Sequence, residues 1–239
     1  MVMNRVSDPF RDPDEVLYPD SDGQPMAENT VQFGWIVMLH ANLDAILPGD
    51  FVGGDLLWYP VEGRPDIRVA PDALVALGRP KGHRGSYIQH REGGVAPAVV
   101  FEVLSPGNSG AEMARKAFFY QRYGVDEFVL IDPDAEDGTA YVRNAHGNFA
   151  EVPTLDGWTS PRLGIRFARE GGRLAVYRPD GSRFRTPEEL EREAVEARKA
   201  AAESERARAE AQDAAEAARA RAERLAAQLR ALGIEPDAG

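Results

Sequence analysis

Hydrophobic positions in the first part of the chain follow helical spacing in two segments. In the first segment, residues 28–47, Glu28-Asn29-Thr30 caps the start and Pro48-Gly49 marks the end. The residues that mostly follow helical spacing on its apolar side are Phe33, Ile36, Val37, His40, Leu43 and Leu47. A second amphipathic segment covers residues 109–123, with Met113, Ala117 and Tyr120 on one side and Gly124 as a stop. We predict a helix over each segment.

Short apolar runs between and after these segments predict strands. The extended candidates cover residues 51–59, 67–70, 72–77, 98–104 and 128–131, and hairpin-like segments follow at 140–143, 164–168 and 174–177. Two of the runs, 72–77 and 98–104, are rich in Val, Leu and Phe, as buried central strands are. The order of helix, strands, helix, strand and then β-rich sequence predicts an α/β domain with a mixed β-sheet.

The composition changes sharply near Thr186. Residues 187–232 are almost entirely Ala, Glu, Arg, Leu and Gln, which include the strongest helix formers. Thr186 before Pro187 is typical of an N-cap, and Gly233 of a C-terminal stop. We therefore predict a domain at 1–186, a long helix at 187–232 and a flexible tail at 233–239.

Small and apolar residues repeat along this predicted helix with a period of 3.5. With Leu190 at heptad position d, Arg208 is the single break at positions a and d. The pattern favours a coiled coil, either a homodimer or a complex with another protein. The alternative is a solvated single helix held by Glu–Arg pairs, because alanine at a and d buries little surface.

The absence of cysteine limits the possible metal sites. No thiolate ligand is available, and the four histidines show no zinc-ligand spacing, so a metal must be held by carboxylate oxygens. The charged N-terminus, residues 1–18, lacks the apolar core of a signal peptide, and no run of about 18 apolar residues occurs. We expect no membrane span and, by default, a cytoplasmic location.

The net charge of −11 disfavours nonspecific nucleic-acid binding, because lysine and arginine supply most of the affinity for phosphate backbones. The distribution of charge differs from the total. Between residues 64 and 91 there are two acids, Asp66 and Asp72, and six basic residues: Arg64, Arg68, Arg79, Lys81, Arg84 and Arg91. This stretch surrounds one of the candidate site residues.

Two acids interrupt apolar strands. Asp72 opens Pro-Asp-Ala-Leu-Val-Ala-Leu, and Glu102 lies inside Val-Val-Phe-Glu-Val-Leu. A buried carboxylate is costly unless a cation or hydrogen-bond donors face it. A Glu-x-Lys motif would place a lysine where Leu104 stands, whereas Lys116 lies on the following helix, four residues after Glu112. If that helix packs over the strand, the amine of Lys116 can reach the acids.

Each of these residues also has a structural interpretation. Asp72 could cap a turn, Glu102 could form a structural ion pair, and Glu112 with Lys116 could be a surface pair. Pro65-Asp66 is a second Pro-Asp, and Pro71-Asp72 is preferred because an apolar strand follows it directly. His83 and His90 are interpreted as loop residues.

The order of these motifs resembles a known family. The chain contains Pro71-Asp72, Val-Phe-Glu102-Val-Leu-Ser-Pro-Gly-Asn, Glu112-x-x-x-Lys116-x-x-x-Tyr120 and then Tyr-Gly-Val-Asp-Glu-Phe-Val-Leu-Ile-Asp-Pro. Over roughly residues 28–180 it resembles the bacterial Uma-two family of restriction endonucleases. The resemblance implies a fold similar to that of the PD-(D/E)XK nucleases, with the lysine moved to the following helix.

The resemblance also implies the roles of the site residues. Asp72 and Glu102 would hold one or two Mg²⁺ or Mn²⁺ ions, and Lys116 would orient the attacking water or stabilise the phosphate charge. Glu28 resembles an additional acid that many such nucleases carry at the start of the first helix. Glu112, where the family usually has aspartate, and Tyr120 are possible supporting residues.

The leading hypothesis is a metal-dependent endonuclease acting on DNA. The competing hypothesis is a catalytically silent nuclease-fold scaffold whose coiled-coil tail binds other proteins, which the acidic total charge and the long tail favour. The presence of all three site residues disfavours a scaffold. RNA is the alternative substrate, because the sequence shows no aromatic RNA-recognition motif by which an RNA substrate could be distinguished from a DNA substrate.

Overall fold

The computed structural model describes residues 16–23 and 26–231 of the 239-residue chain. The chain divides into two compact units, with the boundary between Pro187 and Glu188. The predicted flexible tail at 233–239 and the helix stop at Gly233 lie outside the described residues.

The first unit contains two α-helices, ten strands and a 3₁₀ helix within the described residues. They follow in this order: α1 (Thr30–Ile46), β1 (Phe51–Gly54), β2 (Trp58–Tyr59), β3 (Ala73–Ala76), β4 (Tyr87–Ile88), η1 (Gln89–Glu92), β5 (Val99–Val103), α2 (Gly110–Tyr123), β6 (Glu127–Asp132), β7 (Asp137–Arg143), β8 (Phe149–Glu151), β9 (Arg166–Glu170) and β10 (Arg173–Tyr177).

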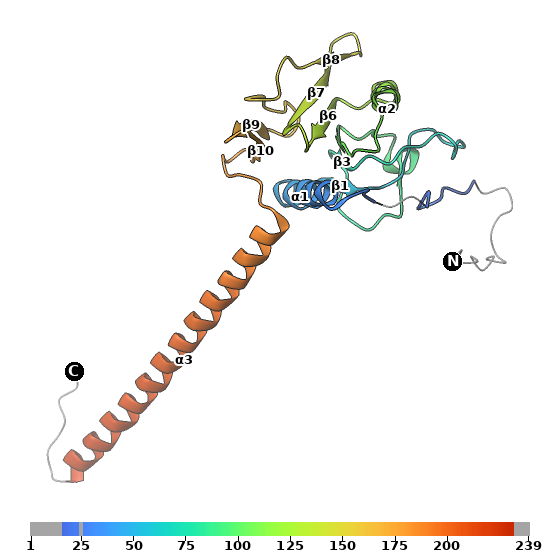
Figure 1. The fold of residues 1–239 in the computed structure, drawn as a ribbon. Helices are drawn as coiled ribbons and strands as arrows, with labels where there is room; N and C mark the ends of the chain where they lie inside the picture. Colours follow the sequence, from blue (N-terminus) through green and yellow to red (C-terminus); the bar gives the residue numbers. More distant parts are fainter. Residues whose placement is uncertain (1–15, 24–25, 232–239) are drawn as a thin grey trace. The chain divides into compact units, whose positions relative to one another are not determined.

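Six of the strands form one mixed sheet in the order β1-β3-β5-β6-β7-β8. Its neighbours are antiparallel except β5 and β6, which run parallel and are joined through α2. Such a strand–helix–strand connection places its helix over one face of the sheet. The prediction of an α/β domain with a mixed sheet flanked by helices is confirmed (Figure 1).

The two faces of the sheet have separate hydrophobic cores. Along β5 the side chains of Val99, Phe101 and Val103 join a core that includes residues of α1. Val100 points to the other face, into a core that includes Tyr120 of α2. Because side chains alternate along a strand, Glu102 lies on the α2 face with Val100.

Helix α1 buries polar side chains on the face that packs against the sheet. Asn29 is its N-cap, and Gln32 and Asn42 are buried. Their amides donate hydrogen bonds to the carbonyls of Val103 and Arg185, at 2.9 and 2.8 Å, which satisfies them away from water. Phe33, which helical spacing assigned to the apolar side, is exposed instead, so that part of the prediction is wrong.

Two of the predicted strands differ in the structure. The run 51–59 is divided into β1 and β2 at Asp55, whose φ of 44° lies in the left-handed region and turns the chain. The run 67–70 is not a strand, because it makes only one isolated bridge, between Val69 and Trp58. The short strands β4 and β8 were not predicted; each pairs with one neighbour only.

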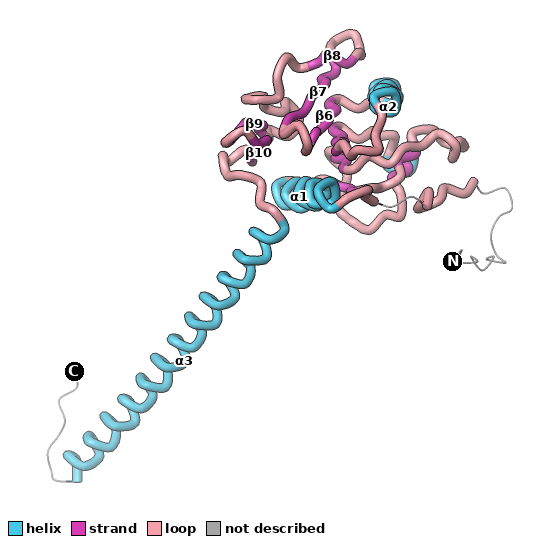
Figure 2. Tube along the Cα trace, in the orientation of Figure 1, coloured by secondary structure: helices cyan, strands magenta, loops and turns pink. Residues whose placement is uncertain are grey.

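The second unit is dominated by one helix, α3 (Pro187–Ala231), which is 45 residues long. Figure 2 shows it as one uninterrupted helix, and none of its residues is buried. Within the described residues, no helix has both the length and the apolar character required to cross a bilayer. The long helix is confirmed as far as Ala231, and the coiled coil stays a prediction.

Candidate active site

Strand pairing brings Asp72 and Glu102 to the same face of the sheet. In the antiparallel pair β3–β5, Ala73 lies opposite Phe101. One step further along this register Asp72 lies opposite Glu102, and directly opposed side chains share a face. Both residues are buried. The apolar strands therefore carry two carboxylates side by side at one end.

Helix α2 supplies the groups that face Glu102. Ser109 caps the helix, and Lys116 and Tyr120 are four residues apart, so they project from one side of it. The Nζ of Lys116 donates to Oε2 of Glu102 at 2.7 Å, and the hydroxyl of Tyr120 donates to Oε1 through a short hydrogen bond. Both oxygens of Glu102 thus have a donor.

Asp72 is held by the main chain beside Glu102. Its Oδ2 accepts a hydrogen bond of 2.6 Å from the N–H of Val103, the residue that follows Glu102. No hydrogen bond to its other oxygen is found among the described residues. One oxygen is thus fixed to the backbone, and the other is available to a ligand.

The electrostatics of the cluster reflect its burial. Burial and, second to it, the neighbouring Glu102 raise the pKa of Asp72 to about 7, against the opposing effects of the Val103 N–H and of Lys116. Burial also raises the pKa of Glu102, although Lys116 and Tyr120 oppose this. Burial alone would lower the pKa of Lys116, but Glu102 outweighs it, so the pKa is raised and the amine stays protonated.

Glu28 lies at the loop that follows Glu102. Its carboxylate accepts hydrogen bonds from the hydroxyl of Ser105 at 2.6 Å and from the N–H of Gly107 at 3.2 Å. A Cβ at Gly107 would lie only 2.3 Å from a Glu28 oxygen, so a larger residue there would displace this carboxylate. Glu28 therefore fastens the start of α1 to the β5–α2 loop, and its contacts are with that loop.

The other described residues that the sequence suggested for the site make no hydrogen bond to Asp72 or Glu102. Lys116 hydrogen bonds to Glu102 and not to Glu112, which acts on it only through its charge. Asp66, the alternative to Asp72, is an exposed residue bound to Arg64 at 2.6 Å. His83 is exposed and His90 belongs to η1. The structure thus brings together Asp72, Glu102, Lys116 and Tyr120.

Asp55 joins this neighbourhood and was missed by the sequence analysis. Its N–H donates to the carbonyl of Asp72 at 3.1 Å, and its φ of 44° is uncommon for a residue with a side chain. Burial and then Asp22 raise the pKa of Asp55, while Lys116 lowers it. The signal available in the sequence was an acid after Gly53-Gly54 that interrupts an apolar run.

The donor set fits a hard divalent cation. The described residues contain no group of three or more histidine, cysteine or acidic side chains arranged to hold a metal. Mg²⁺, however, is commonly held by one or two carboxylates and keeps several waters. Asp72 has an available oxygen, and its raised pKa arises from burial and a like charge, both of which a bound cation offsets. Each oxygen of Glu102 accepts one hydrogen bond and keeps a further lone pair with which it can join the cation.

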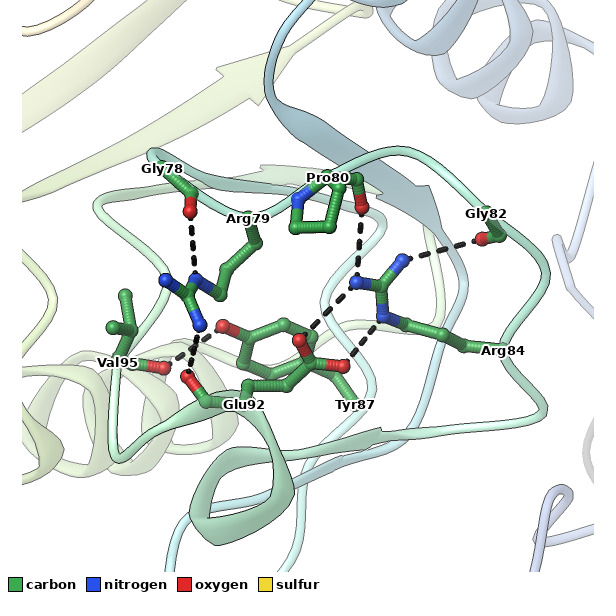
Figure 3. Close-up of polar contacts among 8 residues, drawn as sticks. All are labelled: Gly78, Arg79, Pro80, Gly82, Arg84, Tyr87, Glu92 and Val95. Atoms are coloured by element: carbon green, nitrogen blue, oxygen red, sulfur yellow. Dashed lines mark hydrogen bonds and ion pairs between the residues drawn. The ribbon is translucent and has the colours of Figure 1, made fainter.

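Several cations of the basic stretch at 64–91 are engaged by other groups of the protein, and Figure 3 shows the contacts of Arg79 and Arg84. Arg84 makes two hydrogen bonds to Glu92, at 2.6 and 3.1 Å, and Arg79 donates to the carbonyls of Gly78 and Glu92. Lys81 pairs with Asp44 at 2.6 Å. The expected excess of positive charge around Asp72 is therefore not a free surface, since these cations stabilise the loop itself.

The mixed sheet, its flanking helices and the two acids beside a lysine define a protein of the restriction-endonuclease-like class. The family Uma2, described as "Putative restriction endonuclease", matches residues 35–202, and the chain belongs to this family. The matched range contains Asp72, Glu102 and Lys116 but begins after Glu28.

Comparison with solved structures and curated proteins adds little. A putative nuclease of DUF820 from Anabaena variabilis is 15% identical to this chain, with a TM-score of 0.42. The similarity covers 59% of this chain and 77% of that one. The comparison with curated proteins gave no match. The residues of the cluster must therefore carry the functional argument.

Proposed function

We propose that this chain is a divalent-metal-dependent endonuclease that hydrolyses phosphodiester bonds in DNA. The observation that carries the proposal is the position of Lys116, whose amine lies 2.7 Å from Glu102 on the face of the sheet that also holds Asp72. Two buried acids can hold a cation, and an adjacent ammonium can stabilise phosphate charge. Membership of a family described as restriction endonucleases supports the same activity.

Each residue of the cluster has a definite part in this proposal. When bound to Asp72 and Glu102, Mg²⁺ or Mn²⁺ supplies Lewis-acid polarisation of the phosphate and a more acidic water. Lys116 stays protonated, and its ammonium has three N–H donors, so it can hold Glu102 and also donate to the attacking water or a phosphate oxygen. Tyr120 orients Glu102, and the Val103 N–H orients Asp72.

A plasmid cleavage assay tests this function. The wild type should nick or linearise supercoiled DNA with Mg²⁺ or Mn²⁺ and not with EDTA, and Asp72→Ala should abolish cleavage. Asp66→Ala is the matched control, because it removes the aspartate of the other Pro-Asp and should leave cleavage intact. Equal cleavage by the wild type and Asp72→Ala would reject the assignment. A single-stranded RNA substrate in the same assay tests the alternative choice of nucleic acid.

We further propose that α3 joins two copies of the chain. The heptad pattern places Leu225 at position d and Leu229 at position a, and Leu225 is among the exposed large hydrophobic residues. Introducing charge there, as Leu225→Glu with Leu229→Glu, should shift the protein from dimer to monomer in sedimentation equilibrium. Ala220→Glu, at the outward position f, should leave the dimer unchanged. A wild type that sediments as a monomer would refute this proposal.

A further inference from the structure

An open groove of about 630 Å³ lies between α2 and the segment 66–68. Arginines from both walls line it: Arg68 on one side, and Arg115 and Arg122 on the other. Phe118 and Tyr123 add aromatic surface, and Asp66 is the single acid. The groove is thus both basic and aromatic, although the chain as a whole carries a charge of −11.

The charge of the groove is available to a ligand. Asp66 is already bound by Arg64 through two hydrogen bonds, at 2.6 and 2.8 Å, which neutralises the one acid. Among the described residues, neither Arg115 nor Arg122 makes a hydrogen bond or an ion pair. Arg68 is the one member of the basic stretch that lines the groove, and it donates to the carbonyl of Pro65. Three cations with one neutralised acid favour an anionic ligand.

Phe118 gives the groove a surface for an aromatic ligand. The residue is 64% exposed, so its ring is open to a ligand in the groove. The neighbouring rings pack on one another: Phe119 lies 4.6 Å from Tyr123 and 5.6 Å from the buried Trp58, measured between ring centroids. An exposed aromatic ring in a basic groove is the kind of surface on which nucleobases stack.

We propose that this groove binds an unpaired segment of DNA, with phosphates on the three arginines and a base stacked on Phe118. The bases of a duplex are already stacked on their neighbours, so only an unpaired base can present its face to Phe118. The inference rests on the proposed function, because Arg115 and Phe118 adjoin Lys116 along α2, on another side of the helix, and the segment 66–68 leads into Asp72. The groove would hold the strand beside the acids.

Fluorescence anisotropy with the full chain tests the stacking contact. The probe is a labelled single-stranded DNA of about 15 nucleotides, compared with its duplex, in EDTA so that no cleavage occurs. Phe118→Ala should weaken binding of the single strand by about 5-fold to 50-fold and leave duplex affinity little changed. Phe33→Ala, which removes another exposed phenylalanine, on α1, should change neither.

The arginines are tested by the salt dependence of binding. Arg115→Ala and Arg122→Ala should each weaken single-strand binding and reduce the slope of log K against log salt by about 0.7. Arg206→Ala on the exposed surface of α3 is the charge-matched control and should leave the slope unchanged. Unchanged affinity and slope in both groove variants would overturn the proposal.

The remaining outcomes separate this inference from the proposed function. If the wild type cleaves DNA and the groove variants bind DNA normally, the proposed DNA-binding groove is rejected and the proposed nuclease function still holds. Weakened binding in the groove variants of a chain that cleaves nothing would support the groove and reject the nuclease. A change in sedimentation of Phe118→Ala without any change in DNA affinity would overturn the proposal in favour of a protein contact.

Discussion

Two buried glutamates on neighbouring parallel strands have different surroundings. Glu102 is 3% exposed and lies near the end of β5, whereas Glu127 is 1% exposed and begins β6. The register pairs Glu102 with Leu130 and Glu127 with Val99, so the two carboxylates lie at opposite ends of the strand pair. They are chemically identical side chains in the same sheet.

Within the described part of the chain, the hydrogen-bond donors to Glu127 all come from one turn. Its oxygens accept hydrogen bonds from the hydroxyl of Ser160 and from the N–H of Arg162, the latter at 2.7 Å. Ser160 in turn accepts from the N–H of Leu163 at 3.0 Å. These donors are neutral and belong to one turn, so Glu127 fixes that turn against the sheet.

The groups around Glu102 include charged side chains. They include the protonated amine of Lys116, and a second carboxylate, Asp72, lies on the same face. Burial raises the pKa of both Glu102 and Glu127, so neither burial nor the direction of the shift distinguishes them. The difference is that a charged amine hydrogen bonds directly to Glu102 and a second buried acid lies opposite it. The side chains of Arg162 and Asp126, by contrast, act on Glu127 only through their charges. An ammonium and a second acid are groups that phosphodiester hydrolysis uses.

The largest expected effect is on cleavage. Glu102→Gln removes a proposed metal ligand at nearly constant volume and should reduce DNA cleavage by about 10³-fold or more. Glu127→Gln makes the same chemical change at the structural glutamate and should retain cleavage at temperatures where it is folded. A plasmid assay with both variants measures this difference. Similar losses in the two would remove the functional distinction between them.

The second effect concerns pH and stability at Asp72. The carboxyl has a pKa of about 7 when folded and 3.8 ordinarily, so between these values the folded state binds more protons. The free energy of unfolding should therefore fall as the pH rises from about 4 to about 7, and level off above. Asp72→Asn removes this loss and should stabilise the metal-free protein by on the order of 2 to 4 kcal/mol near pH 8.

Chemical denaturation at several pH values measures this effect. The side-chain amide that Asp72→Asn introduces can still accept from the Val103 N–H, so the hydrogen bond does not confuse the comparison. The stabilisation should shrink toward about pH 4 and disappear below about pH 3, where the aspartate is protonated in both states. A difference between Asp72→Asn and the wild type that is independent of pH would contradict the assignment of a raised pKa.

Local sequence was enough to predict much of the fold. Helix α2 has its N-cap at Ser109 and its stop at Gly124, which adopts φ of 100°, so its limits depend on neighbouring residues alone. The acids were predictable for a related reason, since Asp72 and Glu102 adjoin or interrupt apolar runs. Because these two runs form adjacent strands, Asp72 and Glu102 lie opposite each other.

The missed features depend on partners distant in the sequence. Gln32 is buried because Val103, 71 residues away, accepts its hydrogen bond, and Asn42 is buried because of Arg185, 143 residues away. The basic stretch was overestimated in part because Glu92, which pairs with Arg84, directly follows it and was not counted. The pairing of Lys81 with Asp44, 37 residues away, did depend on a distant partner. Spacing along the chain carries no information about such contacts.

The third effect is stabilisation by metal. Mn²⁺ that binds only the folded state should raise stability by about 2.7 kcal/mol at a concentration 100 times its dissociation constant. The wild type and Glu127→Gln should both show a higher Tm with Mn²⁺, and Glu102→Gln should show little change. NaCl at equal ionic strength is the control for screening. An equal rise in the Tm of Glu102→Gln with Mn²⁺ would indicate that the metal binds at another place.

The smallest effect is on the metal-free stability of the two glutamine variants, measured by denaturation in EDTA. Glu127→Gln should lose about 1 to 3 kcal/mol, because one carboxylate oxygen becomes an NH₂ and a buried donor in the 160–163 turn loses its acceptor. Glu102→Gln should stay within about 1 kcal/mol of the wild type. Lys116 is 22% exposed, so water can reach its amine, and loss of the Glu102 charge relieves Asp72.

The opposite ranking would reverse the assignment of the two glutamates. If Glu102 formed a structural ion pair, its neutralisation would leave the amine of Lys116 without its partner in a largely buried position, which costs about 3 to 5 kcal/mol. Lys116→Met in the Glu102→Gln background distinguishes the two cases. If the pair is structural, Lys116→Met should restore the stability of the protein, because it removes the unpaired charge. If the pair belongs to an active site, Glu102→Gln alone costs little, and Lys116→Met has no loss of stability to recover.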